Sequence, residues 1–253
     1  MRLHVVDAFT DKAFAGNPAG VVVLEHPADP AWMQSVAAEL RHSETAFVEV
    51  GGDGPKRLRW FTPTVEVDLC GHATLATGHV LGGQQAFRTR SGELHTSAGD
   101  GWVSMDFPAD PPAASAENVA PALPGVTVGA VLRGKWDLLV LAGDAAEVRA
   151  TQPDLDVISG WQARCVVVTA PGDKPGVDFV SRVFGPAVGV PEDPVTGSAH
   201  CMLAPFWASR LGRDDLVGEQ ASERGGIVRV QAGRGRVTLA GQAVTVLSGE
   251  LMV

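Results

Sequence analysis

Short apolar runs separated by turn residues dominate the first half of the chain, and two longer stretches have the spacing of helices. Runs of this kind predict strands, which we expect at residues 4–9, 19–24, 44–50, 58–62, 86–90, 92–96 and 101–107. Apolar residues recur at helical spacing over residues 30–40. Residues 72–81 are small and apolar on nearly every side, which is typical of a helix buried inside a domain.

The second half repeats this plan of many strands and few helices. We expect strands at residues 126–132, 138–141 and 165–169, and a short helix with its loop at 148–158. Residues 227–251 alternate between apolar and polar positions and contain regularly placed glycines, which predicts a β meander.

The stretch over residues 108–116 is rich in proline and alanine and is the best candidate for a linker. We therefore expect an N-terminal lobe over residues 1–112 and a C-terminal lobe over residues 113–247. The last strand, at 248–253, is a candidate to complete the first lobe.

One short pattern occurs in both halves. An Arg-x-Phe-x-Pro motif stands at residues 59–63 and again at 182–186, at an offset of 123 residues. A glutamate stands five residues before a glycine in both halves, at Glu66 and at Glu192. Two short matches can also arise by coincidence. A true repeat predicts an α+β protein of two pseudo-symmetric lobes, each a mixed β-sheet or barrel around a central helix.

The segment Glu192 to His200 reads EDPVTGSAH and leads into an apolar run. A proline that disfavours helix before it, followed by Thr-Gly-Ser-Ala, predicts a loop that ends at a helix N-terminus. Free backbone N–H groups and the helix dipole make such an N-terminus suitable for a substrate carboxylate. The alternative is an ordinary cap, in which Asp193 and Ser198 only satisfy backbone donors. With pseudo-symmetry, we expect this helix start and the one at Gly71-His72 to face each other across a cleft.

Two further places supply candidate acid–base groups. Glu44 begins an apolar strand, where desolvation would raise its pKa and make it a usable base toward a weak C–H acid. The Cys70-Gly71-His72 stretch places a thiol and an imidazole beside a glycine, and the helix dipole should keep His72 neutral. The alternatives are a solvated glutamate at a strand end and a core histidine with satisfied hydrogen bonds.

Composition excludes several classes of protein. The net charge of −9 argues against nucleic acid or an anionic membrane as a partner. No apolar run reaches membrane-spanning length and the chain opens on a strand-like segment, so we expect a cytoplasmic protein. The three cysteines lack the spacing of a disulfide framework, and no HExxH or CxxC pattern supports a metal site. No GxSxG, P-loop or GxGxxG signature is present.

Taken together, the motifs have the order and spacing of a known family, and their similarity runs nearly from end to end. The motifs that carry it are Asp7-Ala8-Phe9-Thr10, Gly16-Asn17-Pro18-Ala19-Gly20-Val21-Val22, Ser43-Glu44-Thr45-Ala46-Phe47, Arg59-Trp60-Phe61-Thr62-Pro63, Leu69-Cys70-Gly71-His72-Ala73-Thr74, Glu192 to His200 and the glycine-spaced terminal strands. In these the chain resembles the PhzF phenazine-biosynthesis-like isomerases, which have a diaminopimelate-epimerase-like fold.

The resemblance implies two lobes with a cleft between them, a homodimer, and neither an organic cofactor nor a metal. It matches Glu44 to the family's catalytic base and His72, Asp193 and Ser198 to its other catalytic cleft residues. It further implies substrate contacts from a set of residues near these groups. These are Asn17, Ser43, Gly71, Ala73, Gly197 and Ala199.

The expected function is a cofactor-independent isomerase that moves a proton on a small carboxylate-bearing substrate similar to 2,3-dihydro-3-hydroxyanthranilate. Two alternatives stay open. One is an epimerase or racemase of an amino-acid-like substrate, in which Glu44 acts with Cys70 or His72. The other is a protein that binds a small carboxylate in the cleft and catalyses nothing.

Overall fold

The computed structural model describes all residues from Met1 to Val253, and the chain divides into two compact units. Unit 1 comprises Met1–Asp106 and Ala240–Val253, and unit 2 comprises Phe107–Leu239. The sequence placed the boundaries near residues 112 and 248. In the structure the chain passes between the units after Asp106 and after Leu239. Both crossing points lie inside continuous strands, β8 (Trp102–Pro108) and β17 (Arg236–Gly241), so no change of composition marks them.

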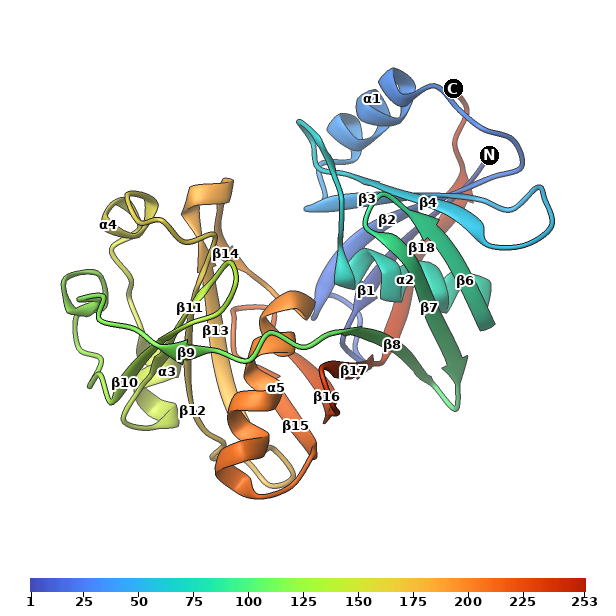
Figure 1. Ribbon diagram of the computed structural model, residues 1–253. Helices are drawn as coiled ribbons and strands as arrows, with labels where there is room; N and C mark the ends of the chain where they lie inside the picture. The colour runs from blue at the N-terminus through green and yellow to red at the C-terminus, as the bar shows by residue number, and fades with distance from the viewer. The chain divides into compact units, whose positions relative to one another are not determined.

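Unit 1 surrounds one buried helix with strands (Figure 1). Its elements in chain order are β1 (Arg2–Ala8), β2 (Asn17–Leu24), α1 (Pro30–Leu40), β3 (Glu44–Glu49), β4 (Lys56–Phe61), β5 (Glu66–Val67), α2 (Gly71–Leu81), β6 (Gly83–Thr89), β7 (Gly92–Gly99), β8 and β18 (Ala243–Glu250). Helix α2 packs against β1, β2, β3, β6, β7 and β18. Its residues from His72 to Gly78 are all buried, which confirms the expectation of a central helix.

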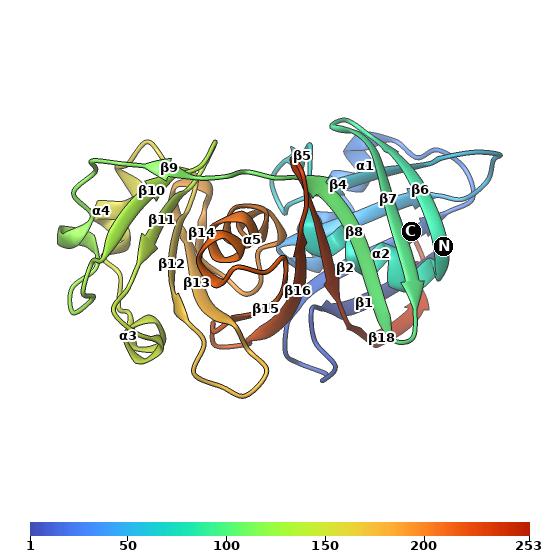
Figure 2. The same cartoon turned by 60° about the horizontal axis from the view of Figure 1, so that its bottom comes forward.

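Unit 2 is built on the same plan. Its elements are β9 (Ala113–Ala114), β10 (Ala130–Arg133), β11 (Leu138–Leu141), α3 (Ala145–Ala150), α4 (Leu155–Ser159), β12 (Val166–Pro171), β13 (Phe179–Gly185), β14 (Val190–Asp193), α5 (Gly197–Leu211), β15 (Asp215–Gln220), β16 (Gly226–Ala232) and most of β17. Short 3₁₀ turns stand at Ala120–Ala122 and Pro186–Val188. Helix α5 packs against β15 and β16, and Figure 2 shows it nearly end-on.

The order and direction of strand pairing are the same in both units. In unit 1, β1–β2 is antiparallel, β2–β3 parallel, β3–β4 antiparallel, β4–β6 parallel and β6–β7 antiparallel. In unit 2, β10–β11, β11–β12, β12–β13, β13–β15 and β15–β16 follow the same sequence of directions. The repeat read from two short motifs is therefore a repeat of the whole topology.

The C-terminal strand returns to unit 1, where β18 pairs antiparallel with β1. The N–H of Leu251 donates to the carbonyl of Met1 at 2.8 Å, so the two ends of the chain lie together. This return begins at Ala240 and not at residue 248, because β18 pairs with β1 along its full length.

Local signals explain why α1 was predicted with its observed bounds. The Asp29 carboxylate accepts a hydrogen bond from the N–H of Ala31, and Pro30 occupies the first turn, where a missing N–H costs nothing. Arg41 adopts a left-handed conformation at φ 56° and its N–H donates to Ala37, which ends the helix.

Two expectations for unit 2 are corrected by the structure. The strand expected at 126–132 is shorter, because the chain turns after Leu123 and pairs only from Ala130. The helix expected at 148–158 is two helices, each capped by its own aspartate, Asp144 and Asp154. Strand β15 was not foreseen. None of the helices is long and apolar enough to span a membrane.

Candidate active site

In each unit, an arginine–glutamate pair ties the strand before the central helix to the short strand that leads into it. The Arg59 guanidinium donates to both Glu66 carboxylate oxygens at 2.7 and 2.8 Å. Arg182 donates to Glu192 in the same bidentate way, also at 2.7 and 2.8 Å. Two parallel charge-assisted hydrogen bonds fix direction as well as distance. The pairs therefore determine where the chain enters α2 and α5.

Both central helices begin with glycine and lack a hydrogen bond from the N-cap side chain. Cys70 and Thr196 are the N-cap residues, and both have extended backbone conformations. The N–H groups of a helix's first turn have no partner inside the helix. Because the cap side chains do not take them, the first turns of α2 and α5 present donors suited to an anion.

Strand β3 and helix α2 bring the proposed base and the imidazole together. Glu44 is the first residue of β3, and its Oε2 lies 3.3 Å from Nε2 of His72 in the first turn of α2. Burial, with a smaller contribution from the nearby His42, lowers the pKa of His72 to about 3. His72 is therefore neutral at physiological pH. A neutral imidazole beside a carboxylate that keeps 21% of its side-chain surface exposed can exchange a proton with it.

Cys70 also lies beside the His72 ring, with its Sγ 3.6 Å from Nδ1 and 4.0 Å from Nε2. Ligand atoms of Glu44, Cys70 and His72 all lie within 4.8 Å of one another. Carboxylate oxygen, thiolate and imidazole are all ligands that divalent zinc accepts. No HExxH or CxxC motif marks this group in the sequence, because Glu44 lies on β3, far from Cys70 and His72 along the chain.

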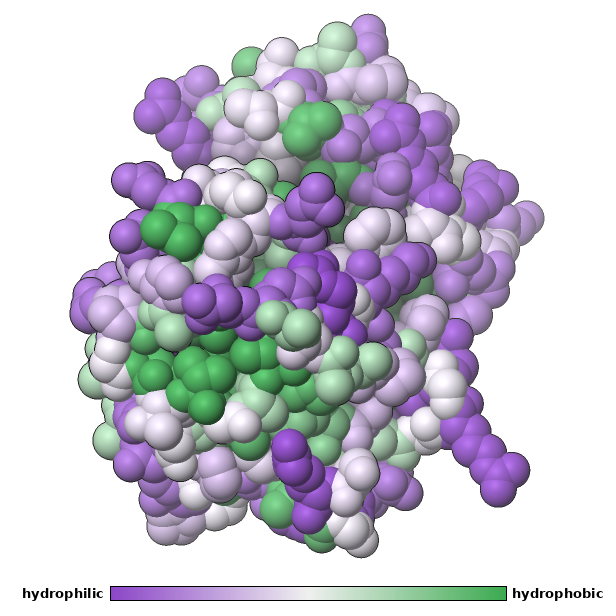
Figure 3. Space-filling model, turned by 60° about the vertical axis from the view of Figure 1, so that its left-hand side comes forward, coloured by the Kyte–Doolittle hydropathy of each residue, from purple (hydrophilic) through white to green (hydrophobic).

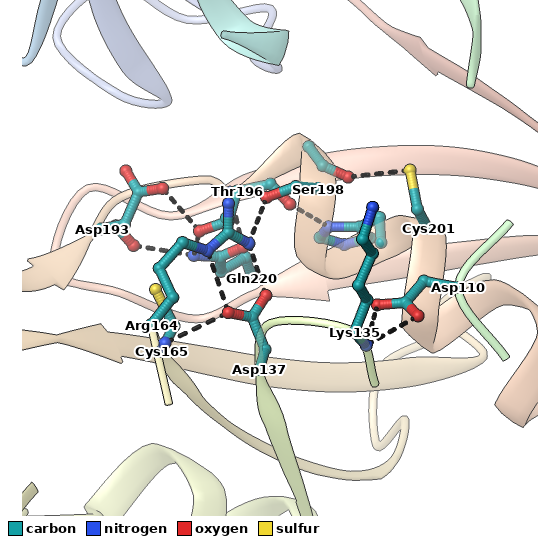
Figure 4. Close-up of polar contacts among 12 residues, drawn as sticks. Asp110, Lys135, Asp137, Arg164, Cys165, Asp193, Thr196, Ser198, Cys201 and Gln220 are labelled. Atoms are coloured by element: carbon teal, nitrogen blue, oxygen red, sulfur yellow. Dashed lines mark hydrogen bonds and ion pairs between the residues drawn. The ribbon is translucent and has the colours of Figure 1, made fainter. Parts of the chain in front are cut away.

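Unit 2 holds Asp193 at the end of β14, four residues before the first residue of α5. The Thr196 hydroxyl donates to Oδ2 of Asp193 at 2.6 Å, so the carboxylate is tied to the helix cap. The Gln220 side chain closes this loop (Figure 4), since it accepts from the N–H of Thr196 at 2.8 Å and donates to the Asp193 carbonyl at 2.7 Å. The loop is therefore fixed from β15, which the sequence analysis missed.

Ser198, in the first turn of α5, contacts an arginine from the segment before β12. Nη2 of Arg164 donates to Oγ of Ser198 at 2.9 Å, and the same guanidinium forms two hydrogen bonds to Asp137, at 2.9 and 2.5 Å (Figure 4). Burial is the largest single influence on Arg164 and opposes its charge, but the hydrogen bond to Asp137 and the Coulomb attraction of nearby acidic groups together outweigh burial and raise the pKa of the guanidinium. The cation beside Ser198 is therefore permanent.

Two further titratable groups of unit 2 are buried and inert. Burial raises the pKa of the Cys165 thiol to about 12, so it stays protonated. Burial also lowers the pKa of His200 to about 4, although the hydrogen bond between its Nδ1 and the Thr196 carbonyl acts in the opposite direction. His200 is a fully buried helix residue that packs on Phe179.

The remaining predicted contact residues lie beside these groups. Gly71 and Ala73 stand in the first turn of α2, and Gly197 and Ala199 in that of α5. Ser43 directly precedes β3. Asn17 begins β2, which runs parallel to β3 with Ala19 opposite Glu44. The unit 1 residues thus gather around Glu44 and the unit 2 residues around Asp193 and Ser198. That the two groups face each other across one cleft stays a prediction.

Sequence reasoning missed Arg164, Asp137 and Gln220. The strand register of the two units shows where Arg164 stands in the repeat. Phe61 pairs with Thr45 in unit 1, and its repeat counterpart Phe184 pairs with Val166 in unit 2. The residue before each pair is Glu44 in one unit and Cys165 in the other. Arg164 is therefore one residue from the position that corresponds to the proposed base.

Comparison with known proteins places this fold and these motifs in one class. A family model described as "Phenazine biosynthesis-like protein" matches residues 6–249. An uncharacterized isomerase of Halalkalibacterium halodurans is 43% identical over an alignment that covers 99% of this chain and 98% of that protein. The chain has the α+β architecture of the epimerase-like isomerases, and it belongs to the phenazine biosynthesis-like (PhzF) family.

Solved structures agree with this assignment. The crystal structure of a phenazine biosynthesis protein of the PhzF family from Enterococcus faecalis has a TM-score of 0.95 and 38% sequence identity, and covers 100% of this chain and 99% of that one. A hydroxyproline epimerase from Agrobacterium vitis has a TM-score of 0.64 and 12% identity, and covers 98% of this chain and 91% of that one. The second likeness shows the shared epimerase-like fold.

Proposed function

We propose that this protein is an isomerase that moves a proton between carbon atoms of a small carboxylate-bearing substrate by cofactor-independent acid–base catalysis. The observation that carries the proposal is the 3.3 Å contact between the Glu44 carboxylate and the neutral His72 imidazole at the start of α2. A positioned acid–base pair of this kind typically contributes a rate factor of about 10² to 10⁴. Family membership supports the class of reaction.

In the proposed reaction, Glu44 removes a proton from a carbon next to a conjugated acid or imine group of the substrate. The C–H electron pair moves into the conjugated system, which then carries an enolate-like charge. Backbone N–H groups of the helix starts and the Ser198 hydroxyl stabilise that charge by hydrogen bonds. The proton returns from Glu44, directly or through His72, to a different carbon. The bond that breaks and the bond that forms are both C–H bonds, and no oxidant or reductant takes part.

Asp193 has a binding role in this proposal. Its carboxylate is tied to the helix cap through Thr196 and is suited to orient an amino or hydroxyl group of the substrate. The substrate class that fits carries both a carboxylate and such a group, as 2,3-dihydro-3-hydroxyanthranilate does.

Solvent exchange tests the proposal. The protein is incubated in deuterated water with 2,3-dihydro-3-hydroxyanthranilate and with a panel of related amino and hydroxy acids, and carbon-bound deuterium is followed by NMR. We expect one substrate to gain deuterium at the new C–H position. Absence of exchange with every compound, or full exchange by Glu44→Gln, would contradict the mechanism.

An amino-acid epimerase or racemase is the second candidate, and the position of Cys70 favours it. The Cys70 thiol is 3.6 Å from Nδ1 of His72, so a second acid–base group lies on the same helix start. An epimerase returns the proton to the same carbon with inverted configuration, whereas the proposed isomerase returns it to another carbon. Chiral analysis of the deuterated product separates the two.

We further propose that the protein forms a homodimer, as the family resemblance implies. Large apolar side chains are exposed on unit 2, among them Trp136 and Val188, and Figure 3 shows apolar residues gathered in a patch on one face of the molecule. Contiguous apolar patches commonly mark protein interfaces. Light scattering coupled to size-exclusion chromatography would give the mass of the particle, and a monomer at micromolar concentration would contradict this.

A further inference from the structure

A three-residue chain of hydrogen bonds ends at the Ser198 hydroxyl. Asp137 holds Arg164 through both carboxylate oxygens, and Arg164 donates to Oγ of Ser198 at 2.9 Å. The Asp137 side chain is only 3% exposed, and it also accepts from the N–H of Cys165 at 3.1 Å. Figure 4 shows the guanidinium lying between the carboxylate and the hydroxyl. The hydrogen bonds to Asp137 therefore fix the orientation of the guanidinium that donates to Ser198.

The direction of the last hydrogen bond decides what Ser198 can do. A hydroxyl has one hydrogen to donate and two lone pairs that accept. A guanidinium has only donors, so Ser198 must accept from Arg164. Its own hydrogen is then left for another group, and the adjacent positive charge polarises the O–H bond and strengthens that donation.

We infer that Arg164, anchored by Asp137, is a positioning residue that sets Ser198 as a hydrogen-bond donor to a negatively charged oxygen of the substrate. The inference rests on the proposed function, in which Ser198 touches the substrate. It specifies the chemistry of the group at this place as a carboxylate or enolate-like oxygen. An amino group, which would need Ser198 to accept, is disfavoured there by the same cation.

The corresponding place in unit 1 has the opposite charge. The second residue of α2 is His72, which contacts the Glu44 carboxylate, whereas the second residue of α5 is Ser198, which contacts the Arg164 guanidinium. The repeat therefore sets a carboxylate beside the second residue of α2 and a guanidinium beside the second residue of α5. An anionic oxygen of the substrate is therefore favoured beside Ser198.

A double-mutant cycle tests whether Arg164 acts through Ser198. Deuterium incorporation into 2,3-dihydro-3-hydroxyanthranilate is measured for Ser198→Ala, Arg164→Met and the double variant. We expect each single variant to lower kcat by about 10²- to 10³-fold, the range for a lost transition-state hydrogen bond, with a smaller change in KM. The double variant should be no slower than Ser198→Ala alone. Multiplication of the two effects would overturn the inference.

A conservative variant and a matched control separate positioning from folding. Arg164→Lys keeps the cation but cannot form both hydrogen bonds to Asp137 and still reach Ser198, so partial recovery of kcat is expected. Arg149 forms a comparable bidentate pair with Glu219, and the contacts of that pair do not include Ser198. Arg149→Gln should lower the melting temperature yet keep the kcat of the folded protein. Equal loss of kcat in Arg149→Gln would overturn the inference.

Arg164→Met leaves the Asp137 carboxylate buried without its cation, so the variant could fail to fold. The double variant Asp137→Asn with Arg164→Met removes that charge, and it should fold and show the same loss of kcat. A crystal structure of this variant gives a readout that needs no substrate. We expect Ser198 to occupy more than one rotamer there and a single rotamer in a crystal structure of the wild-type protein.

The outcomes distinguish this inference from the proposed function. If the wild-type protein exchanges no deuterium, or if Ser198→Ala is as fast as wild type, the proposed function fails at Ser198, and the rotamers alone decide whether Arg164 positions the side chain. If Ser198→Ala is slow but Arg164→Met is as fast as wild type, the proposed function stands and this inference is overturned. An unchanged single Ser198 rotamer without Arg164 would also overturn it.

Discussion

The two units share one topology but differ in the groups that meet at their helix starts. In unit 1 the first residue of β3, Glu44, reaches His72 of α2. In unit 2 the same register position holds Cys165, and the neighbouring Arg164 reaches Ser198 of α5. Unit 1 thus presents a carboxylate in contact with a neutral imidazole, a pair that can pass a proton between its members. At the second residue of α5, unit 2 presents a permanent cation and a hydroxyl, which can bind an anionic group, and its Asp193 carboxylate is tied to the helix cap.

The shared parts of the two units are structural. Both arginines of the repeated motif bind a glutamate in bidentate fashion, and each guanidinium lies over the phenylalanine two residues further on, at 5.1 and 5.0 Å from the ring centroid. The repeat therefore preserves the contacts that fix where each central helix begins. Function then follows from one or two residues at the strand end, which the repeat leaves free to diverge.

The largest expected effect separates Glu44 from Cys165, its counterpart in register. Glu44→Asp withdraws the carboxylate by one methylene from His72, and a displacement of about 1 Å can cost roughly 10²-fold in rate. Cys165→Ala removes a thiol that is protonated, because burial raises its pKa to about 12, and should change kcat by less than about twofold. Steady-state deuterium exchange measures both. Comparable losses in the two variants would contradict the assignment of proton transfer to unit 1.

The next effect concerns stability and tests what the units share. Removing one member of a buried ion pair costs about 3 to 5 kcal/mol because the partner is left uncompensated. Glu66→Gln should approach roughly 3 kcal/mol, since the Arg59 and Glu66 side chains are only 8% and 12% exposed. Glu192→Gln should cost less, because Glu192 is 23% exposed.

Urea denaturation monitored by tryptophan fluorescence checks both variants, with Glu93→Gln as a control at an exposed glutamate. The two units could unfold in separate transitions, in which case each variant should shift only the transition of its own unit. A larger cost for Glu192→Gln than for Glu66→Gln would contradict the ranking by burial.

Much of this architecture could be predicted from sequence because its signals are local. Asp29 and Pro30 mark the start of α1, and the repeated Arg-x-Phe-x-Pro motif revealed the shared topology. Strand β15 escaped prediction because it buries polar residues, Glu219 and Gln220. These are stable there only through partners elsewhere, such as Arg149 for Glu219.

The same distinction holds at the candidate site. Glu44 and His72 stand in motifs whose residue types indicate acid–base chemistry. In the structure Oε2 of Glu44 lies 3.3 Å from Nε2 of His72. Arg164 stands in no motif, and its two partners lie 27 and 34 residues away in the sequence. A polar contact between distant residues leaves no periodic or compositional trace, so only the fold reveals it.

A smaller effect concerns pH, because each unit buries a neutral histidine in its central helix. The pKa is lowered to about 3 for His72 and to about 4 for His200, against 6.5 for an unperturbed imidazole. As pH falls below 6.5 the unfolded chain takes up protons that the folded protein cannot, so stability decreases. The loss should reach about 1 kcal/mol per histidine near pH 5.5. His200→Gln should flatten the dependence between pH 6.5 and 4.

Unfolding free energies measured at pH 7.5, 6.5 and 5.5 check this, with His95→Gln as the control because His95 is exposed. Stability that rises on acidification to pH 5.5, or a His200→Gln variant that is as steep as wild type, would show that these histidines do not govern the dependence.

The smallest expected effect sharpens the claim that unit 1 works by acid–base chemistry alone. Glu44, Cys70 and His72 form a group that could hold a divalent metal. In unit 2 the cation beside Ser198 is the Arg164 guanidinium, which Asp137 holds in place. If the Glu44 carboxylate is the base, it must not be occupied as a ligand during turnover. Dialysis against EDTA should therefore leave deuterium exchange within about twofold of the untreated protein. Loss of exchange that zinc restores, together with the absence of such restoration in Cys70→Ser, would show instead that unit 1 acts through a metal-bound water.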